Sequence, residues 1–465
     1  MLRRRSLAFL LLSSLFAVAC TSDDDTDDGG RSDAGPAGGS SAPDAAVADA
    51  GACPERGSGS LRIAVTGLPA GLAPELELTG PDGSMDVEAA AVFDDAAGGE
   101  YTLVAERVLS DDPIVRALYI PAQERSTQCV KDGRETRIDV RYALVPTSNK
   151  LWAANDVEDA ALVAFPAAEL AASASPAAGL AFDVTAGGDV AFDRDGNLWS
   201  FGATLAEAPL LRHAASSLTA GAMALPDREL EVEGIPCIPT MRAMAFDAQG
   251  NLWLSVCGGK LLRLTPAMLA LGRSGTEMVR ATVQISELID NRDLAFDAAG
   301  NLWVGDDGKI ARYDAARLIR SDSSAPDALF VLRNADDSAD IGVDYLTFDE
   351  DGDLWATSFG GNFVAEIAKA DLAGSDALPL IAKVSLVLSV TALLDRPAFD
   401  DAGGLWISYS TGKLVRISPA DLTISTGAGA PTEPDVILDG GEIGSAGNVA
   451  FFPAAAGLPL YHAYP

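Results

Sequence analysis

The chain has 465 residues, five cysteines and a formal net charge of −34 at pH 7. A surface this acidic repels nucleic acid and anionic membrane surfaces, so the composition excludes a nucleic-acid-binding protein. The charge favours solubility and cationic partners, although a solvated acidic surface and an acidic linker explain it more simply.

Residues 1–19 have the layout of a signal peptide. Three arginines precede an apolar run over residues 7–18 that is too short to span a membrane, and Ala17-Val18-Ala19 leads directly into Cys20. This arrangement resembles the lipobox of bacterial lipoproteins, although Ala17 stands where that family usually has leucine. The resemblance implies acylation of Cys20 and a place in the bacterial cell envelope, periplasmic or surface-exposed. A plain secretory signal with a chance cysteine is the alternative.

Residues 20–52 are rich in Asp, Gly, Ser, Ala and Pro and contain almost no large apolar side chain. Such a segment cannot bury enough surface to offset its ordering entropy, so we expect a disordered acidic tether after the lipidated cysteine.

Four cysteines remain once Cys20 is assigned to lipidation, an even number that suits an oxidising compartment. We predict the disulfides Cys53–Cys129 and Cys237–Cys257, since the first pair brackets a candidate domain and the second a repeat boundary. The cysteines and histidines lack the spacing of zinc ligands, so no metal centre is expected.

Residues 53–142 read as a small all-β domain. Four segments alternate apolar and polar residues or carry β-branched and aromatic side chains, and glycine-rich turns separate them: residues 61–65, 76–78, 101–105 and 137–142. Short strands over about ninety residues favour a β-sandwich. The order of its turns and strands resembles immunoglobulin-like or transthyretin-like accessory modules of bacterial surface proteins.

Residues 143–465 contain a repeat of about 50 residues that is marked by tryptophan. Five of six copies end the pattern Phe-Asp-x-x-Gly-x-Leu-Trp, and every tryptophan follows a leucine: Trp152, Trp199, Trp253, Trp303, Trp355 and Trp406. In the copy from Leu294, four strands are expected over residues 294–296, 302–304, 310–313 and 328–332. Four antiparallel strands per repeat predict one propeller blade.

The third predicted strand carries an arginine in four copies, Arg212, Arg263, Arg312 and Arg416, whereas Ala164 and Glu366 replace it in the other two. Six blades form if residues 448–451 complete the blade of Trp152, which would also remove the open edge of the ring. Because residues 143–145 align as a further inner strand, and residues 458–461 could add another, a seven-bladed ring is the runner-up.

The repeated phrase is similar to repeats of the NHL and streptogramin-lyase-like propeller families over about the last 320 residues. This resemblance implies a ligand face formed by loops that enter the innermost strands. Streptogramin lyases use histidines there as acid and base, but this chain has only His213, on a third strand, and His462, near the end. The departure argues against lyase activity.

Aligning the repeats on their phenylalanine predicts which residues lie at this ligand face, called the mouth of the propeller below. The candidate ligand-binding residues carry charges of both signs: Arg242, Arg292, Asp293, Asp344, Asp395 and Arg396. Mutual ion pairing of a solvated ring is the competing interpretation. Calcium could use the mouth carboxylates, but the neighbouring arginines would neutralise such a site, so no cofactor is expected. Hairpin turns explain the Asp-x-Asp-Gly runs better than calcium loops do.

We therefore expect a lipid-anchored, extracytoplasmic, all-β protein that acts as a binding module. Its partner would be a protein or a glycan, its only membrane contact the N-terminal lipid, and its oligomeric state monomeric. The alternative is a metal-dependent hydrolase, lactonase or lyase that uses the mouth carboxylates, an expectation based on fold analogy alone.

Overall fold

A computed structural model describes residue 53 and residues 57–155, 162–182, 186–202, 209–219, 225–233, 235, 241–273, 275–358, 361–374, 379–389, 393–426, 430–439 and 446–454. The chain divides into two units, residues 1–52 and 53–465. The predicted signal peptide, Cys20 and the tether lie outside the described residues. Within the described part, none of the helices has the length and apolar character needed to cross a bilayer.

The first domain consists of two sheets that share one core. Alternate residues of four strands meet in that core, among them Leu61, Leu78, Leu103 and Ile138, each no more than 2% exposed. This arrangement is a β-sandwich, and all four predicted segments are strands. The first sheet has the order β4 (Ala91–Ala97), β1 (Ser58–Thr66), β9 (Glu135–Leu144), β7 (Leu118–Pro121) and β6 (Val108–Leu109), and the second has the order β3 (Gly83–Asp86), β2 (Leu76–Gly80), β5 (Gly99–Ala105) and β8 (Arg125–Val130).

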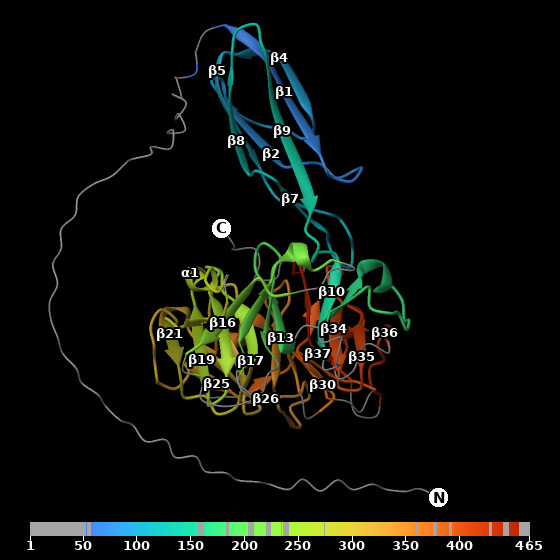
Figure 1. Ribbon diagram of the computed structural model, residues 1–465. Coiled ribbons are helices and arrows are strands. Elements are labelled where there is room, and N and C mark those ends of the chain that lie inside the picture. The colour runs from blue at the N-terminus through green and yellow to red at the C-terminus, as the bar shows by residue number, and fades with distance from the viewer. Residues whose placement is uncertain are drawn as a thin grey trace, which may run out of the picture. The chain divides into compact units, whose positions relative to one another are not determined.

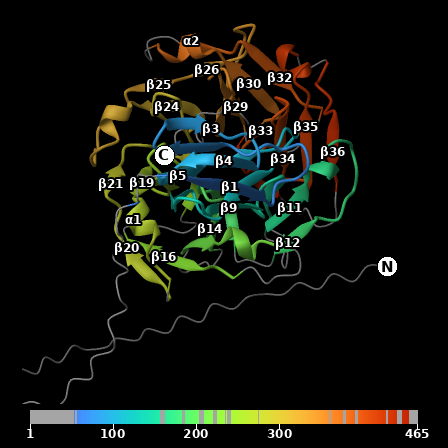
Figure 2. The ribbon, with the colours of Figure 1, turned by 90° about the horizontal axis from the view of Figure 1, so that it is seen from above.

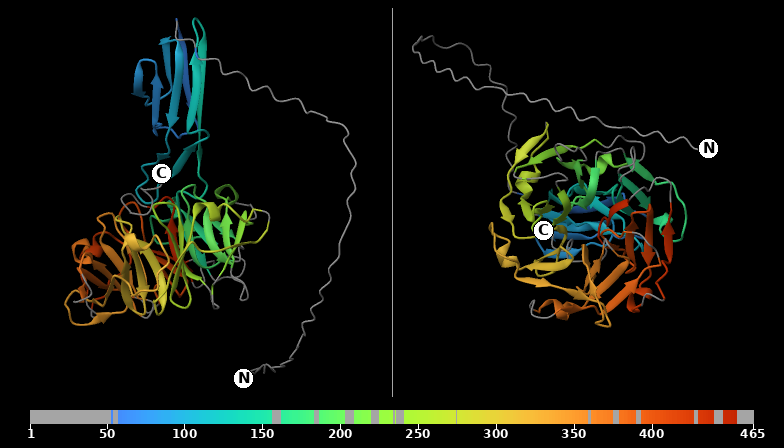
Figure 3. Two further views of the ribbon diagram at one scale, coloured as in Figure 1. Left: turned by 90° about the vertical axis from the view of Figure 1, so that its left-hand side faces the viewer. Right: turned by 90° about the horizontal axis from the view of Figure 1, so that it is seen from below.

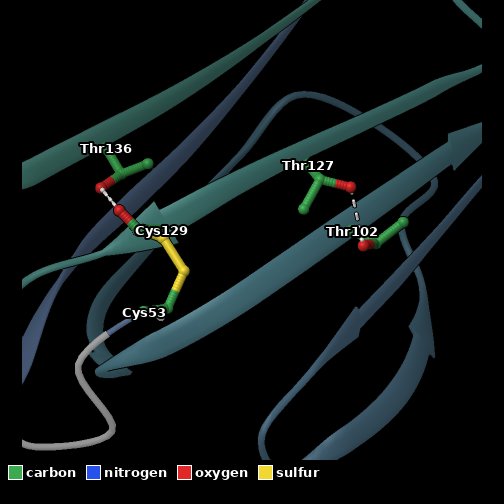
Figure 4. The surroundings of a disulfide bond; sticks show 5 residues. All are labelled: Cys53, Thr102, Thr127, Cys129 and Thr136. Carbon is green, nitrogen blue, oxygen red and sulfur yellow. Dashed lines mark hydrogen bonds between the residues drawn. A yellow bond between two sulfur atoms is a disulfide. The ribbon is translucent and has the colours of Figure 1, made fainter. Parts of the chain in front are cut away.

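The predicted Cys53–Cys129 disulfide is confirmed, with 5.6 Å between the two Cα atoms (Figure 4). Cys129 lies on β8, an edge strand of the second sheet. The hydroxyl of Thr136 on β9 donates to the Cys129 carbonyl at 3.1 Å. The disulfide thus ties the segment before β1 to the edge of the second sheet.

The second domain (Figure 1) is a β-propeller, and the right-hand view of Figure 3 shows its blades around a common centre. The described residues form six sets of four antiparallel strands, one of them extended by a fifth strand, and each set contains one of the six tryptophans on its second strand. Blade 1 contains β37 (Ala446–Phe451), β10 (Lys150–Asn155), β11 (Leu162–Pro166) and β12 (Leu180–Phe182); blade 2 contains β13 (Ala186–Phe192), β14 (Leu198–Gly202), β15 (Leu210–His213) and β16 (Arg228–Val232); blade 3 contains β17 (Met241–Phe246), β18 (Leu252–Val256), β19 (Lys260–Leu264) and β21 (Val283–Ile285).

The remaining blades follow the same order from the inner strand to the outer one. Blade 4 contains β22 (Asn291–Phe296), β23 (Leu302–Asp306), β24 (Lys309–Tyr313) and β25 (Ala328–Phe330); blade 5 contains β28 (Tyr345–Phe348), β29 (Leu354–Thr357), β30 (Phe363–Ile367) and β32 (Val384–Val387); blade 6 contains β33 (Ala398–Phe399), β34 (Leu405–Tyr409), β35 (Lys413–Ile417) and β36 (Val436–Leu438).

Short additional strands and helical turns lie at the outer rim of the propeller. The strand β20 (Glu277–Val279) joins β16 in parallel, and a small sheet consists of β26 (Leu332–Arg333), β27 (Asp340–Ile341) and β31 (Leu380–Ile381). Single helical turns follow the third strands: η1 (Ala167–Glu169), η2 (Ala215–Ser217), α1 (Pro266–Leu269), η3 (Ala315–Arg317), α2 (Lys369–Leu372) and η4 (Asp421–Thr423).

Strands from the two ends of the repeat array close the ring. In blade 1, Leu151 pairs with Phe451 and Trp152 with Ala450, so β37 supplies the inner strand as predicted. The residues that favoured a seventh blade are placed differently, since Ala143 and Leu144 belong to β9 of the sandwich. Residues 458–461 lie outside the described part of the chain.

The repeated aspartate stabilises the turn between the first two strands of a blade. In blade 4, Asp297 Oδ1 accepts from the amides of Ala299 and Asn301 at 2.9 Å, and its Oδ2 accepts from the Trp303 indole at 2.9 Å. Gly300 in the same turn has φ +81°, which strongly favours glycine. The Phe-Asp-x-x-Gly-x-Leu-Trp pattern is therefore a hairpin turn whose aspartate also fixes the tryptophan.

Each tryptophan packs between neighbouring blades, as expected for a large ring on a second strand. The Trp253 ring lies 6.1 Å from Phe296 of blade 4, and the Trp355 ring lies 5.7 Å from Phe399 of blade 6, both edge-to-face. Trp152 belongs to the copy without the aspartate, and its indole donates to the Thr147 carbonyl at 2.8 Å instead. The tryptophans thus hold neighbouring blades of the ring together.

Candidate functional site

β-Bulges at the starts of two inner strands point the side chains of successive residues in different directions. Pairing of β22 with β23 shifts register between Asn291 and Asp293, and pairing of β17 with β18 shifts between Met241 and Ala243. Arg292 and Arg242 are the extra residues, and each has a side chain 34% exposed. A bulge commonly redirects a side chain in this way near a functional site.

A buried ion-pair network ties the blades together across the axis. Arg396 of blade 6 contacts both oxygens of Asp189 in blade 2 at 3.0 Å and also pairs with Asp293 of blade 4. The side chains of Asp189 and Asp293 are 0% exposed and that of Arg396 is 13% exposed. Burial raises the pKa of Asp189, and the nearby Arg396 opposes this effect.

Backbone amides complete the coordination of these two carboxylates. Asp293 accepts from the amide of Leu294 at 2.7 Å and from that of Leu346 in blade 5 at 2.8 Å. The amide of Arg396 in turn donates to Asn448 of blade 1 at 3.1 Å. Because these groups are buried and paired with one another, Asp293 and Arg396 act as ties between blades.

A second network is partly exposed at the mouth. Arg242 pairs with Asp290, and Arg292 contacts Asp290 at 3.1 Å and Asp344 at 3.2 Å. Although partial burial opposes ionisation, the two arginines lower the pKa of Asp290. The chain Arg242–Asp290–Arg292–Asp344, called the mouth chain below, carries two positive and two negative groups, so it presents donors and acceptors without net charge.

Hydroxyl groups fix the backbone around the mouth chain. The Thr357 hydroxyl of blade 5 donates to the Asp395 carbonyl at 3.1 Å, and the Ser408 hydroxyl of blade 6 donates to the Gly447 carbonyl at 2.6 Å. At Gly305 a Cβ atom would lie 2.3 Å from the Asp344 carbonyl oxygen, so only glycine allows this close approach. The mouth is therefore a preorganised surface.

Asp395 lies beside the mouth chain and has a different electrostatic environment. Burial, followed by repulsion from Asp189 and Asp344, raises the pKa of Asp395 to about 6, while a hydrogen bond with the Tyr345 hydroxyl opposes the rise. Burial and Asp395 together also raise the pKa of Tyr345. A half-buried carboxyl group that titrates near neutral pH can exchange a proton with a bound molecule.

The six predicted mouth residues therefore fall into three settings. Arg242, Arg292 and Asp344 lie in the mouth chain, Asp293 and Arg396 in the buried network, and Asp395 beside Tyr345. The ion pairing that the sequence left open is thus extensive. Sequence reasoning missed Asp290, because no repeated position marks this residue before the bulge of β22.

The carboxylates proposed for calcium are largely engaged by arginines, since Asp293 pairs with Arg396 and Asp344 with Arg292. Three other carboxylates, Asp349, Asp353 and Glu366, lie within 4.8 Å of one another in blade 5. The Lys383 ammonium contacts Glu366 at 2.5 Å and Asp353 at 2.9 Å, so a lysine already neutralises part of that cluster.

Cys237 lies outside the described residues, so only one end of the predicted Cys237–Cys257 bridge is described. Cys257 directly follows β18 at the mouth end of blade 3, is 7% exposed and is disulfide-bonded. Pairing of Cys257 with Cys237 stays a prediction.

The sheets define this chain as a β-propeller protein with an N-terminal β-sandwich. No family model matches the sequence, and no curated protein matches it. Among solved structures, it is similar to the C-terminal WD40 domain of Sif2, with 10% identity, a TM-score of 0.35, and coverage of 72% of this chain and 82% of that one.

Two further propellers show a similar level of likeness. The β-propeller domain of Myceliophteria thermophila Cps50 (Swd1) has 11% identity, a TM-score of 0.35, and coverage of 58% of this chain and 87% of that one. A streptogramin B lyase structure has 12% identity, a TM-score of 0.34, and coverage of 54% and 88% respectively. The blades themselves establish the fold, and the site must carry any conclusion on function.

Proposed function

We propose that this protein is a lipid-anchored, extracytoplasmic binding module that holds a polar partner on its propeller mouth. The observation that supports the proposal is the mouth chain, in which alternating guanidinium and carboxylate groups are fixed by ion pairs yet remain about one-third exposed at Arg242, Asp290 and Arg292. Preorganised donors and acceptors lose little conformational entropy on binding.

The chemistry of the mouth chain favours a neutral, hydrogen-bonding partner. Its two arginines and two aspartates balance in charge, so attraction of a strongly charged ligand is weak. A hydroxyl-rich glycan or a polar protein loop matches alternating donors and acceptors.

Binding of panels of immobilised neutral glycans and polar peptides to the full chain tests this proposal. We expect the Arg292→Gln and Arg242→Gln variants to lose at least tenfold in affinity for a bound partner. Arg333→Gln, which removes an arginine paired with Asp337 and Asp340 on the rim, serves as the matched control. Equal binding by all variants, or no binding partner in either panel, would contradict the proposal.

Anchoring requires a separate experiment because Cys20 lies outside the described residues. We expect the intact protein to incorporate a labelled fatty acid and to enter the membrane fraction, and the Cys20→Ser variant to do neither. Lipid labelling that persists in Cys20→Ser would remove the anchor from the proposal and leave the mouth site unaffected.

One observation favours a second candidate function, a hydrolase or lyase that uses the mouth carboxylates. The pKa of Asp395 is raised to about 6 by burial and neighbouring charges, which suits a general acid or base. Assays with lactones and glycosides between pH 5 and 8 test it, with calcium present or chelated. Activity that Asp395→Asn abolishes supports an enzyme, whereas activity that survives this change excludes the role of Asp395.

A further inference from the structure

An arginine on the third strand occupies the space between neighbouring blades. Arg263 lies over the Trp253 ring with its guanidinium carbon 5.9 Å from the centroid, and Arg312 lies over Trp303 at 5.6 Å. Such contacts between a guanidinium and an indole are attractive. The strand register explains the repetition, since each arginine is directly paired with the tryptophan of its blade.

The same arginines also reach the next blade. Arg263 Nη1 donates to the Leu318 carbonyl at 3.2 Å, and Arg312 Nη1 donates to the Leu372 carbonyl at 2.7 Å. Both leucines end the short helical turn after the third strand of that next blade. The guanidinium is thus held by an indole on one side and a carbonyl of the neighbouring blade on the other.

Between blades 5 and 6 this arginine is missing. Glu366 is paired with Trp355 at the equivalent position, and a cavity of about 350 Å³ lies there. Its lining includes both residues and also Leu422, which belongs to η4 and corresponds to Leu318 and Leu372. Figure 2 shows β29, β30 and β32 of blade 5 beside β33, β34 and β35 of blade 6. The cavity therefore occupies the place that a guanidinium fills elsewhere in the ring.

The cavity is strongly acidic. Among its described lining residues Lys383 is the basic one, against six carboxylates: Asp349, Glu350, Asp351, Glu366, Asp400 and Asp401. Arg416 pairs with Asp400, and Arg116 of the sandwich domain pairs with Asp401 at 2.8 Å. Even after these pairs and the contact of Lys383 with Glu366, three lining carboxylates remain in excess, so the cavity attracts cations.

We propose that the cavity between blades 5 and 6 binds a guanidinium group, either on a small molecule or on an arginine side chain of a partner protein. The guanidinium would stack on Trp355 and donate to Glu366 and the Leu422 carbonyl, in the manner of Arg312 in blade 4. A planar fork of donors suits these acceptors better than the compact ammonium of lysine does. This site is separate from the mouth chain, so it stands or fails independently of the proposed function.

Calorimetric titration of the full chain with N-acetyl-arginine amide tests the proposal. The assay is run at pH 8, because burial raises the pKa of Glu366 to about 7 and its carboxylate must be ionised. We expect binding at least tenfold tighter than that of the N-acetyl-citrulline amide, which has nearly the same shape without the charge, and tighter than that of the lysine analogue. Equal affinity for arginine and citrulline, or no heat of binding, would overturn the proposal.

Variants locate the binding in the cavity. Glu366→Arg combined with Lys383→Asp introduces the arginine that blades 2, 3, 4 and 6 carry at this position and should abolish binding by filling the space. Glu366→Gln, which keeps the side-chain size, should weaken binding about tenfold even if the double variant folds poorly. Glu100→Gln, an exposed change on the sandwich domain, is the matched control. Unchanged affinity in Glu366→Gln would refute this location.

A comparison of ligands identifies the source of the guanidinium. The probes are N-acetyl-arginine amide and the pentapeptide Gly-Ser-Arg-Ser-Gly, blocked at both ends. Tighter binding of the peptide assigns the site to a protein-borne arginine, and equal binding assigns it to a small guanidinium compound. Either result upholds the shared chemistry, whereas failure of both probes to bind contradicts it.

Discussion

Blades 5 and 6 are neighbours with the same backbone pairing but opposite charges at one position. In blade 6, Arg416 on the third strand contacts Asp435, directly before the fourth strand, at 2.6 Å. In blade 5 the order is reversed, with Glu366 on the third strand and Lys383 directly before the fourth, 2.5 Å apart. In both blades the amide of the residue before the fourth strand donates to the carbonyl of the third-strand residue. The scaffold therefore accepts either orientation of the ion pair.

The two orientations differ in what else the third-strand side chain reaches. Arg416 extends to Asp400, the turn aspartate that also accepts from the Trp406 indole. Glu366 is shorter and carries no donor when ionised, so it has no such contact with the turn aspartate Asp349, a fellow carboxylate. The place that Arg312 fills beside Trp303 is thus an acidic cavity beside Trp355.

Among the substitutions that test this comparison, removal of the turn aspartate should change the free energy of unfolding most. Asp400→Asn should lower the free energy of unfolding by about 3 kcal/mol, because it leaves the largely buried Arg416 guanidinium with only the partly exposed Asp435 as its carboxylate partner. Asp349→Asn, which disturbs the same turn and indole contacts but no arginine, should cost about 1 kcal/mol. Denaturant unfolding measures both, and equal losses would show that the buried pair contributes nothing beyond the turn.

A second test of the comparison introduces into blade 5 the third-strand arginine that blades 2, 3, 4 and 6 carry. Glu366→Arg with Lys383→Asp should raise the free energy of unfolding by about 2 kcal/mol, since the new side chain fills the cavity and stacks on Trp355. Glu366→Arg alone should destabilise, because its guanidinium would face the Lys383 ammonium. A double-mutant cycle by thermal unfolding gives the coupling energy. A double variant less stable than the unchanged protein would contradict the equivalence of the two junctions.

The two blades should also differ in how their stability depends on pH, because the Glu366 carboxyl group titrates near neutral pH and the Arg416 guanidinium does not. Burial, followed by the contribution of Asp353, raises the pKa of Glu366 to about 7 against the opposing effect of Lys383. The folded protein therefore keeps a proton that the unfolded chain loses above pH 4.5, and this stabilisation is lost as the pH rises to about 7.

Glu366→Gln should remove about 1 kcal/mol of that pH dependence. Thermal unfolding of both proteins at pH 4.5 and pH 7.5 measures the difference. Asp395, whose pKa is about 6, titrates in both and cancels in the comparison. Identical slopes for the two proteins would mean that Glu366 is ionised throughout this range.

The exposed half of the blade 6 pair gives the smallest effect. Asp435→Asn should cost about 0.5 kcal/mol, because its carboxylate is one-third exposed and Arg416 keeps Asp400. Asp227→Asn in blade 2, which removes a similarly exposed partner of Arg212, should cost the same amount. A loss above 2 kcal/mol at Asp435 alone would indicate that Arg416 depends on both of its carboxylates.

The propeller was predictable because its determinants are local and repeated. Asp297, Gly300 and Trp303 act within one turn, so their spacing in the sequence reports their contacts directly. Pairing of Leu151 with Phe451 was also predictable, since it is the arrangement that lets the last repeated strand complete the first blade. The arginine positions followed from the same register.

The details of the sites were less predictable because they join residues from different repeats. Arg396 contacts Asp189 and Asp293 across the axis, and no spacing along the chain encodes these distances. The sequence revealed that Glu366 departs from the repeated arginine, but not that Lys383 reverses the pair. No repeated position in the sequence marked Asp290, which pairs with both bulge arginines, Arg242 and Arg292.

The pairing of β10 with β37 also governs how the domain can fold. Leu151 and Phe451 are 300 residues apart, so their contact closes a very long loop, whose entropic cost grows only slowly with its length. Rates of folding, by contrast, fall steeply as contacts become more distant in sequence. Blades 2 to 5 can form as each is synthesised, whereas blade 1 must wait until residue 451 is available. Until then β10 exposes an unpaired edge, which makes the nearly complete ring the species most exposed to mispairing and aggregation.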